Sequence, residues 1–235
     1  MSPIIQSAVH NGLLAALPPS EFALLAAFLT PVDLIFNEFL YQAEQPMEAA
    51  YFIETGMVSC IASLESGEAV EVGLIGAEGV VGLPVAFGRV SIPQAALVQL
   101  GGTAYRLNAA TLRQAFGASE GLRDRLLRCL QVLHTQVVQT GVCNGHHLLE
   151  KRLARWLLMV HDRAGDDRFP MTHEFMGMML GVRRAGVTVA SGALKKVGLV
   201  DYANGHMTIR DRRGLENAAC ECYGVVQRHR AQFQT

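Results

Sequence analysis

Short apolar runs separated by turn residues characterise the chain from about Asp33 to Leu107. The runs begin near residues 38, 50, 57, 69 and 94, and glycines at positions 56, 67, 76, 79, 82, 101 and 102 separate them. Runs of this length at this spacing are typical of β-strands joined by tight turns. The pattern therefore predicts a small antiparallel barrel or sandwich. Before it, Leu13 to Leu29 has the composition of a helix interrupted at Pro18-Pro19.

A helical period replaces this pattern after Gly117. Mostly apolar residues recur in steps of three and four, which places them on one stripe of a long helix, and Ser119 stands where it can cap the start. We predict that this stripe is a dimer interface, with Gly141 allowing close backbone approach. Packing against the chain's own barrel is the alternative. The predicted interface residues are Leu122, Leu126, Leu130, Leu133, Val137 and Gly141.

Further elements are predicted from Thr140 to the end of the pattern. Helix-breaking residues from Thr140 to His147 predict a hinge. Leu148 to Ala164 has the spacing of an amphipathic helix. Residues 165–170 are predicted to form a loop. After two short helices, Asn204-Gly205 predicts the turn of a two-residue hairpin. A final helix is expected from a cap at Asp211 to about Tyr223.

The two short helices have the spacing of a helix-turn-helix. Such a motif needs a small residue where the helices cross, a glycine four residues later at the turn, and a branched apolar residue six beyond that. Gly177, Gly181 and Val187 satisfy this spacing, and Thr172 stands where it can cap the first helix. Because a predicted hairpin follows directly, the pattern is that of a winged helix.

The outer face of the second helix carries side chains that suit DNA. Arg184 can pair with guanine, and Thr188 can contact a phosphate, a base edge or a thymine methyl. Arg183, Lys195 and Lys196 are better placed for phosphates. An ordinary solvated face is the alternative interpretation of these cations. The predicted DNA-binding residues are Thr172, His173, Arg183, Arg184, Ala185, Thr188, Val189, Lys195, Lys196, Asn204 and His206.

The total charge of the chain argues against a polyanion partner, but its distribution favours one. The 235 residues include 20 Lys+Arg and 21 Asp+Glu. Residues 1–146 hold 6 Arg, no Lys and 12 acids, for a net charge of -6, whereas residues 147–235 hold 14 Lys+Arg and 9 acids, for +5. This asymmetry indicates two domains with different partners, of which the basic one carries the helix-turn-helix.

Composition also excludes several classes of protein. A 50% hydrophobic content excludes a disordered chain. No run approaches the ~18 apolar residues of a membrane span, and no secretory signal precedes the first helix. Five scattered cysteines suit a reducing compartment. We therefore expect a cytoplasmic protein without a membrane partner.

The sequence predicts neither a metal site nor an enzyme. Cys220-Glu221-Cys222, and Cys143 near His146-His147, include metal-binding residue types. A C-x-C on a helix directs its thiols to different faces, so structural cysteines are the favoured interpretation. No nucleophile elbow, P-loop or H-E-x-x-H motif occurs, and we predict no catalytic residue. Oxidant sensing by one cysteine is a further hypothesis.

Together these motifs resemble the CRP/FNR family of bacterial transcription regulators over nearly the whole chain. The resemblance rests on residues 51–58, the glycines of 76–82, the stripe and the helix-turn-helix. It implies an α+β fold: an N-terminal antiparallel β-roll, double-stranded and jelly-roll-like, over 1–118, a dimerisation helix and hinge over 119–146, and a winged helix-turn-helix over 147–235. It also implies a homodimer on an imperfect palindrome of double-stranded DNA, with RNA polymerase as a partner.

The resemblance weakens at the positions that bind effectors. The family's recognition arginine falls on Arg184, but Ala185 replaces the glutamate of the best-known members, so the DNA half-site should differ. The effector pocket would lie at Gly82, Leu83, Gln94, Ala95 and Ala96. These positions lack the carboxylate and the arginine that hold cyclic AMP, whose phosphate would be costly to bury alone.

No cofactor is predicted. An iron–sulfur cluster needs four thiolates, and Cys60 is the only cysteine before residue 129. The effector stays unidentified. A competing interpretation is a small-molecule sensor or enzyme whose basic C-terminal domain docks a protein instead of DNA.

Overall fold

The computed structural model describes residues 4–89 and 91–234, and their contacts divide them into two units. The first unit contains the residues up to Cys60 and Leu74–His134. The second contains Ile61–Gly73 and Thr135–Gln232. Within the described ranges, no helix combines the length and the apolar character needed to cross a bilayer.

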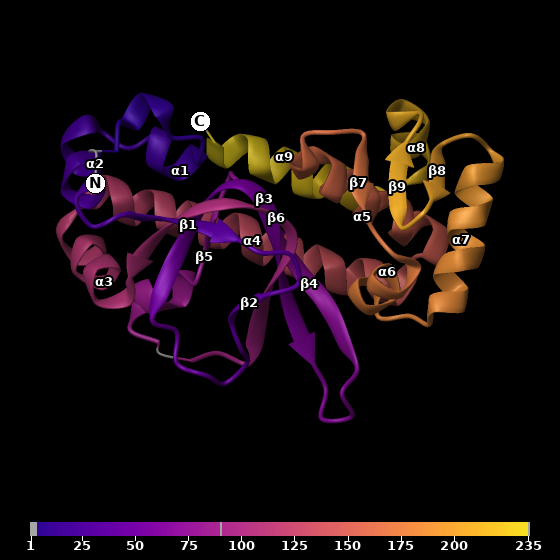
Figure 1. Ribbon diagram of the computed structural model, residues 1–235, viewed down its shortest axis with the longest axis horizontal. Helices are drawn as coiled ribbons and strands as arrows, with labels where there is room; N and C mark the ends of the chain where they lie inside the picture. Colours follow the sequence, from indigo (N-terminus) through magenta and orange to yellow (C-terminus); the bar gives the residue numbers. More distant parts are fainter. Residues whose placement is uncertain (1–3, 90, 235) are drawn as a thin grey trace. The chain divides into compact units, whose positions relative to one another are not determined.

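An antiparallel sheet forms the centre of the N-terminal part (Figure 1). Its strands follow the order β1-β6-β3-β4, with β2 also on β6 and β5 on β3. The pairs β1–β6, β2–β6 and β3–β5 are antiparallel. The strands are β1 (Thr30–Leu34), β2 (Phe39–Tyr41), β3 (Ala49–Ser63), β4 (Ala69–Ile75), β5 (Val80–Val81) and β6 (Gln94–Asn108). The predicted α+β fold with an N-terminal antiparallel sheet is confirmed.

Short helices precede this sheet. They are η1 (Gln6–Ala8), α1 (Gly12–Ala15) and α2 (Pro19–Ala26), and η2 (Leu83–Phe87) lies between β5 and β6. The chain breaks its helix at the proline pair, as the sequence predicts, because Pro19 occupies a first-turn position where no amide hydrogen is needed. Phe22 and Leu25 of α2 are buried in the core.

Asn11 is a fully buried polar residue that joins α1 to the sheet. Its Nδ2 donates to the carbonyl oxygens of Ile53 at 2.9 Å and Gly79 at 2.8 Å. Its Oδ1 accepts from the Leu14 amide at 3.1 Å and so caps α1. Its own amide donates to Glu54 Oε1 at 2.8 Å. The donor group and the acceptor oxygen of the Asn11 side chain therefore both have partners, as a polar side chain buried away from water requires.

Helix α4 (Glu120–His146) follows α3 (Ala109–Ala118) and begins at a double cap. The Leu122 amide donates to Ser119 Oγ at 3.1 Å, as predicted, and also to the Glu21 carboxylate at 3.0 Å. The Ser119 hydroxyl donates to the same carboxylate. This bond, aided by the amides of Leu122 and Gly121, holds the pKa of Glu21 below its usual value. A carboxylate at this position also complements the helix dipole.

The hinge predicted within residues 140–147 is misplaced. Helix α4 is continuous to His146, so the glycines at 141 and 145 are helical and the chain leaves the helix only at His147 and Leu148. Glycine lowers helix propensity by about 1 kcal/mol per residue, which tertiary contacts can outweigh.

The C-terminal elements form a winged helix-turn-helix (Figure 1). They are α5 (Leu149–Ala164), β7 (Arg168–Pro170), α6 (His173–Leu180), α7 (Arg184–Lys196), β8 (Val200–Ala203), β9 (His206–Ile209), α8 (Arg212–Ala218) and α9 (Cys222–Gln234). Two expectations are corrected here. The 165–170 loop includes β7, which pairs with β9, and the final helix is two helices with a break between Ala218 and Cys222.

Helix α5 supplies the core of the second unit. Leu153, Trp156, Leu157 and Val160 are buried, as the amphipathic spacing predicts. Trp156 Nε1 donates to Glu71 Oε1 at 2.9 Å, so a buried carboxylate of the β3–β4 hairpin receives a hydrogen bond from the same unit.

Replacement of Asn11 by alanine tests the buried join between α1 and the sheet. The Asn11→Ala variant should lose about 2–4 kcal/mol of unfolding free energy, because two buried carbonyls lose their donor and α1 loses its cap. Asn108→Ala is the matched control, since Asn108 only caps α3 by accepting from the Ala110 amide at an exposed site. Its loss should be about 1 kcal/mol. Urea unfolding followed by circular dichroism measures both, and equal losses would contradict this role of Asn11.

Candidate nucleic-acid interface

Helices α6 and α7 cross at Gly177, which lies where the motif requires a small residue. A Cβ built on Gly177 would lie 2.9 Å from the Val182 carbonyl oxygen and 3.4 Å from the Arg184 nitrogen. Gly177 is buried, and its carbonyl accepts from the Val182 amide at 2.9 Å. Because backbone atoms cannot yield as a flexible side chain can, only glycine fits here without displacing the start of α7.

The turn between the helices also follows the predicted chemistry. Gly181 has φ +62° and ends α6, and its amide donates to the carbonyls of Gly177 and Met178. A left-handed residue at this point is the usual end of a helix. Thr172 Oγ1 accepts from the Phe175 amide at 3.1 Å and caps α6, and Val187 is fully buried. The predicted helix-turn-helix is confirmed in each of these positions.

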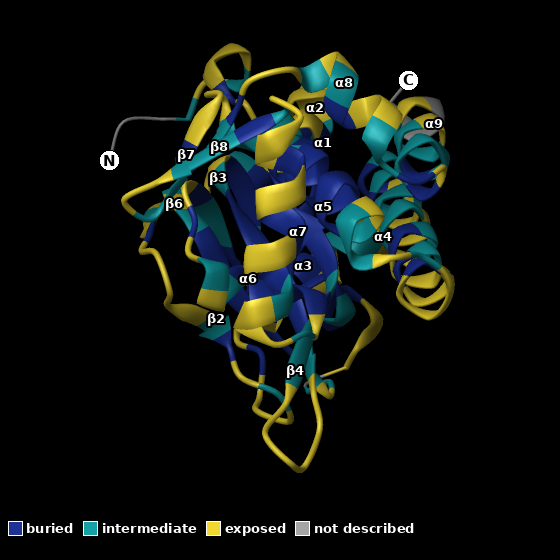
Figure 2. Cartoon of the chain, turned by 90° about the vertical axis from the view of Figure 1, so that its right-hand side faces the viewer, coloured by how far each residue is buried: buried dark blue, intermediate teal, exposed yellow. Residues whose placement is uncertain are grey.

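The outer face of α7 is exposed along its length (Figure 2). Its members are Arg183, Arg184, Ala185, Thr188, Val189, Gly192, Lys195 and Lys196. In the described part of the chain, no carboxylate pairs with Arg183, Arg184 or Lys196. Val189 is 69% exposed, whereas the other large apolar residues of the helix, Val187 and Leu194, are buried. This face combines three cations that have no carboxylate partner among the described residues with one exposed apolar side chain.

Thr188 and His173 contact each other. The Thr188 hydroxyl donates to the Arg184 carbonyl at 3.1 Å, so it accepts at 3.0 Å from His173 Nδ1, which then carries the proton. The His173 ring stacks on Tyr202 at 4.0 Å. Burial and the nearby positive charge of Arg184 lower the pKa of His173. These two predicted DNA contacts therefore brace α6, α7 and β8, and a neutral His173 adds no charge near a phosphate.

Lys195 is held by an acid that the sequence analysis did not single out. Its Nζ lies 2.6 Å from Asp201 Oδ1, and Arg210 Nη2 lies 3.4 Å from Oδ2 of the same carboxylate. The hydrogen bond from Lys195, together with the Tyr202 amide, lowers the pKa of Asp201. Side chains alternate between the two faces of a strand. This alternation could have indicated that Asp201 lies on the face of the hairpin that carries Arg210.

The predicted hairpin turn is confirmed. Asn204 and Gly205 have φ of +51° and +74°, the conformation of a type I′ turn, and Ala203 pairs with His206. His206 Nδ1 lies 3.0 Å from the Asn204 carbonyl oxygen, so this contact occupies one ring nitrogen at the tip. Asn204 is exposed and His206 half-buried.

The predicted effector positions lie in the core of the sheet unit. Leu83, Ala95 and Ala96 are buried, and Gln94 is half-buried at the start of β6. Gly82 has φ +83°, and a Cβ there would lie 2.7 Å from the Ala49 carbonyl oxygen. These residues therefore pack in the core or, at Gly82, form a tight turn.

The stripe on α4 divides into a buried and an exposed part. Leu122 and Leu126 are fully buried against their own chain, so for these two the alternative interpretation is correct and neither is available to a partner. Leu130 and Val137 are exposed, Leu133 is half-buried, and no heavy atom of the described residues lies within 4 Å of a Cβ on Gly141. Sequence reasoning missed three further exposed apolar residues, Leu127, Val138 and Val142, which continue the same steps of three and four.

Comparison with known proteins agrees with this architecture. Residues 151–218 match the family model of the Crp-like helix-turn-helix domain. Comparison with curated proteins finds no match. The matched segment runs from the first turn of α5 to the end of α8, the elements of the winged helix-turn-helix.

Solved structures extend the likeness to the whole fold. FixK2 from Bradyrhizobium japonicum is 21% identical, with 82% of this chain and 98% of that chain covered and a TM-score of 0.70. A transcriptional regulator of the Crp/Fnr family from Eubacterium rectale is 16% identical, with 89% and 98% covered and a TM-score of 0.71. The c-di-GMP-responsive regulator CLP from Xanthomonas campestris is 14% identical, with 82% and 99% covered and a TM-score of 0.64. The chain has the fold of CRP/FNR regulators.

Substitution at Gly177 tests the helix crossing. Gly177→Ala should cost about 1–3 kcal/mol of unfolding free energy, because the new methyl meets backbone atoms. Gly192→Ala, on the exposed face of α7 with no described heavy atom within 4 Å of its Cβ, is the control. That change should be neutral or stabilising by up to about 1 kcal/mol. Thermal unfolding measures both, and an unchanged Gly177→Ala protein would show that the crossing is not tight.

Proposed function

We propose that the protein is a sequence-specific DNA-binding transcription regulator that acts as a homodimer. The observation that carries this proposal is the exposed face of α7, whose cations Arg183, Arg184 and Lys196 lack a carboxylate partner in the described chain. The Crp-like domain match supports it, because a recognition helix in that motif enters the major groove through its N-terminal residues. Arg184 begins α7 and so stands at that end.

The side chains of α7 divide by role. Arg184 would form a bidentate pair with guanine, and the exposed Val189 would contact an apolar base edge such as a thymine methyl. Arg183 and Lys196 would contact phosphates, which supply affinity without reading sequence. Lys195 contributes less than the sequence suggests, because Asp201 already neutralises it.

The exposed apolar line on α4 supports the dimer. Leu127, Leu130, Val137, Val138 and Val142 follow one face of a helix of 27 residues. An exposed apolar surface on a long helix is stabilised when a second copy covers it. In the proposed dimer, two recognition helices read two half-sites about 10 base pairs apart. RNA polymerase remains the expected protein partner at promoters.

The sensor part is proposed not to bind cyclic AMP in the usual way. Gly82, Leu83, Gln94, Ala95 and Ala96 provide neither a carboxylate for a ribose nor a cation for a phosphate, and most are packed in the core. A buried phosphate without a cation would be strongly disfavoured.

Paired substitutions on α7 test base reading. Arg184→Ala should cost about 1–3 kcal/mol on a DNA site obtained by in vitro selection and should relax specificity at one position per half-site. Lys196→Ala is the control, because losing a phosphate contact weakens binding to all sequences and lowers the salt slope by about one. Fluorescence anisotropy against selected and scrambled DNA measures both. Undiminished discrimination by Arg184→Ala would exclude this role.

A charge on the exposed line of α4 tests the dimer. Leu130→Glu combined with Val137→Glu should weaken self-association ~100-fold or more, because two carboxylates would be buried at the interface core. Leu64→Glu, another exposed leucine outside α4, is the control and should leave association unchanged. Sedimentation equilibrium gives the result. A double variant that dimerises like the control would place the interface elsewhere.

A further inference from the structure

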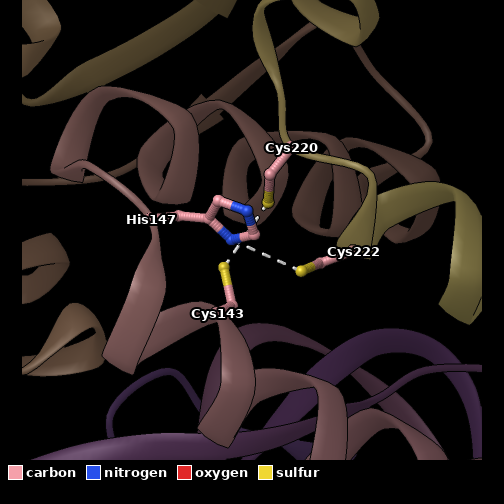
Figure 3. Close-up of side chains that lie close together, drawn as sticks. All are labelled: Cys143, His147, Cys220 and Cys222. Atoms are coloured by element: carbon pink, nitrogen blue, oxygen red, sulfur yellow. Dashed lines mark hydrogen bonds between the residues drawn. The ribbon is translucent and has the colours of Figure 1, made fainter.

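Four side chains of metal-binding residue types gather in the second unit. They are Cys143, His147, Cys220 and Cys222, and their ligand atoms all lie within 4.8 Å of one another. Cys143 Sγ lies 3.5 Å from Cys220 Sγ, and Cys222 Sγ lies 3.6 Å from His147 Nδ1 (Figure 3). The four side chains come from two chain segments that are more than 70 residues apart in sequence.

The local backbone explains why these side chains converge. Cys143 lies in the last turn of α4 and His147 directly follows that helix, four residues on, where side chains share a face. Cys220 lies in the break between α8 and α9, whereas Cys222 is the first residue of α9. The sequence-based expectation that this C-x-C lies on one helix, with thiols directed to different faces, is therefore wrong. A turn before a helix lets both thiols face one point.

Two distances within the cluster are close to those of tetrahedral zinc. Zinc binds thiolate at ~2.3 Å and imidazole nitrogen at ~2.0–2.1 Å, so tetrahedral angles separate two sulfurs by ~3.8 Å and a sulfur from a nitrogen by ~3.6 Å. The observed separations of 3.5 Å and 3.6 Å need only small adjustments to meet these values. A set of three thiolates and one imidazole is a known structural zinc combination, and soft ligands disfavour magnesium or calcium.

A buried arginine beside the cluster would balance the negative charge that the cluster carries once zinc is bound. Arg155 is only 3% exposed, and the side chains to which it donates hydrogen bonds, Thr140 and Met159, are neutral. Its Nε is buried without a hydrogen-bond partner among the described residues, and it lies within electrostatic range of the Cys143 sulfur. Among residues 4–89 and 91–234, no carboxylate pairs with it. Zinc with three thiolates and a neutral histidine carries one negative charge, which would compensate this arginine.

Groups around the cluster orient its ligands. His147 presents Nδ1 to the thiols, and its Nε2 lies 3.3 Å from Glu221 Oε2. A carboxylate on the second ring nitrogen is the usual support of a metal-binding histidine, since it fixes the tautomer. Gln139 Nε2 donates to Cys222 Sγ at 3.1 Å. Cys143 and Cys222 are fully buried, so the centre is closed to solvent on the thiol side.

We propose that Cys143, His147, Cys220 and Cys222 bind one Zn²⁺ as a structural site. On binding, the three thiols release their protons and coordinate as thiolates, while His147 coordinates as a neutral imidazole through Nδ1. The protein supplies all four ligands, which leaves no open position for a reacting water. The metal fastens the C-terminal end of α4 to the α8–α9 connection. It thereby orders the winged helix against the helix end that precedes it, within the second unit.

Metal analysis of the full chain tests this site. The protein is purified in reducing, chelator-free buffer and analysed by inductively coupled plasma mass spectrometry. One zinc per chain is expected for the wild type and for Cys60→Ser and Cys129→Ser, the matched controls at cysteines outside the cluster. Cys143→Ser and Cys222→Ser should lose stoichiometric zinc. Glu221→Gln should keep the metal but with affinity ~10-fold weaker, as expected for a supporting residue.

Cobalt provides a second readout that does not require a variant to fold. Wild-type protein stripped of metal and titrated with Co²⁺ should develop intense tetrahedral d–d bands and a thiolate-to-cobalt charge-transfer band, saturating at one equivalent. If the isolated wild type holds no zinc and the stripped protein does not develop this spectrum on titration, the proposal is overturned. A stoichiometric Cys143–Cys220 disulfide in metal-free protein isolated under argon would overturn it as well.

The effect on DNA binding rests in addition on the proposed function. Chelation should lower affinity for a selected DNA site, and one equivalent of zinc should restore it. Because metal content is measured without DNA, a failure of DNA binding leaves the metal result intact. Zinc loss without any change in DNA affinity would confine the metal to a purely stabilising role.

Discussion

The close backbone approach at Gly177 is the constraint on which the exposed face of α7, the proposed DNA-binding surface, depends. A Cβ there would press on the atoms that begin α7, so the angle between α6 and α7 requires a residue without a side chain. That angle buries Val187 and leaves Arg184, Thr188 and Val189 on the opposite side. The left-handed turn at Gly181 and the Thr172 cap then fix the same geometry from both ends of α6. One steric requirement thus orients an entire recognition surface.

Electrostatics within the second unit reduce the number of cations that can reach DNA. The segment 147–235 has a net charge of +5, but several of its cations are already engaged. Lys195 pairs with Asp201, Arg212 lies 2.5 Å from Asp162, and Arg152 donates to the Leu180 carbonyl in the core. Arg183, Arg184 and Lys196, which have no carboxylate partner among the described residues, stand at the two ends of α7. The net charge of a segment therefore overestimates the number of cations that are available for binding. That number depends on which cations already have a partner within the protein.

Much of this architecture could be predicted from local sequence signals. Spacing of glycines and a branched residue identified the helix-turn-helix, and Asn204-Gly205 identified the wing, because both depend on backbone conformations that few residues adopt. Contacts between distant segments could not be read in this way. Periodicity cannot distinguish Leu126, buried on its own chain, from Leu130, which is exposed, and nothing local brings His147 near Cys222. The cysteine cluster was missed because its geometry depends on the break at residues 219–221, which the helical pattern after Asp211 does not reveal.

The central claim is that two copies of this chain read DNA through α7. In vitro selection of random double-stranded DNA by the purified full-length protein, followed by sequencing, tests it most directly. The account predicts an enriched inverted repeat whose half-sites are centred about 10 base pairs apart, with a guanine in each half-site facing Arg184. Recovery of unenriched DNA, or of a single half-site without symmetry, would contradict it.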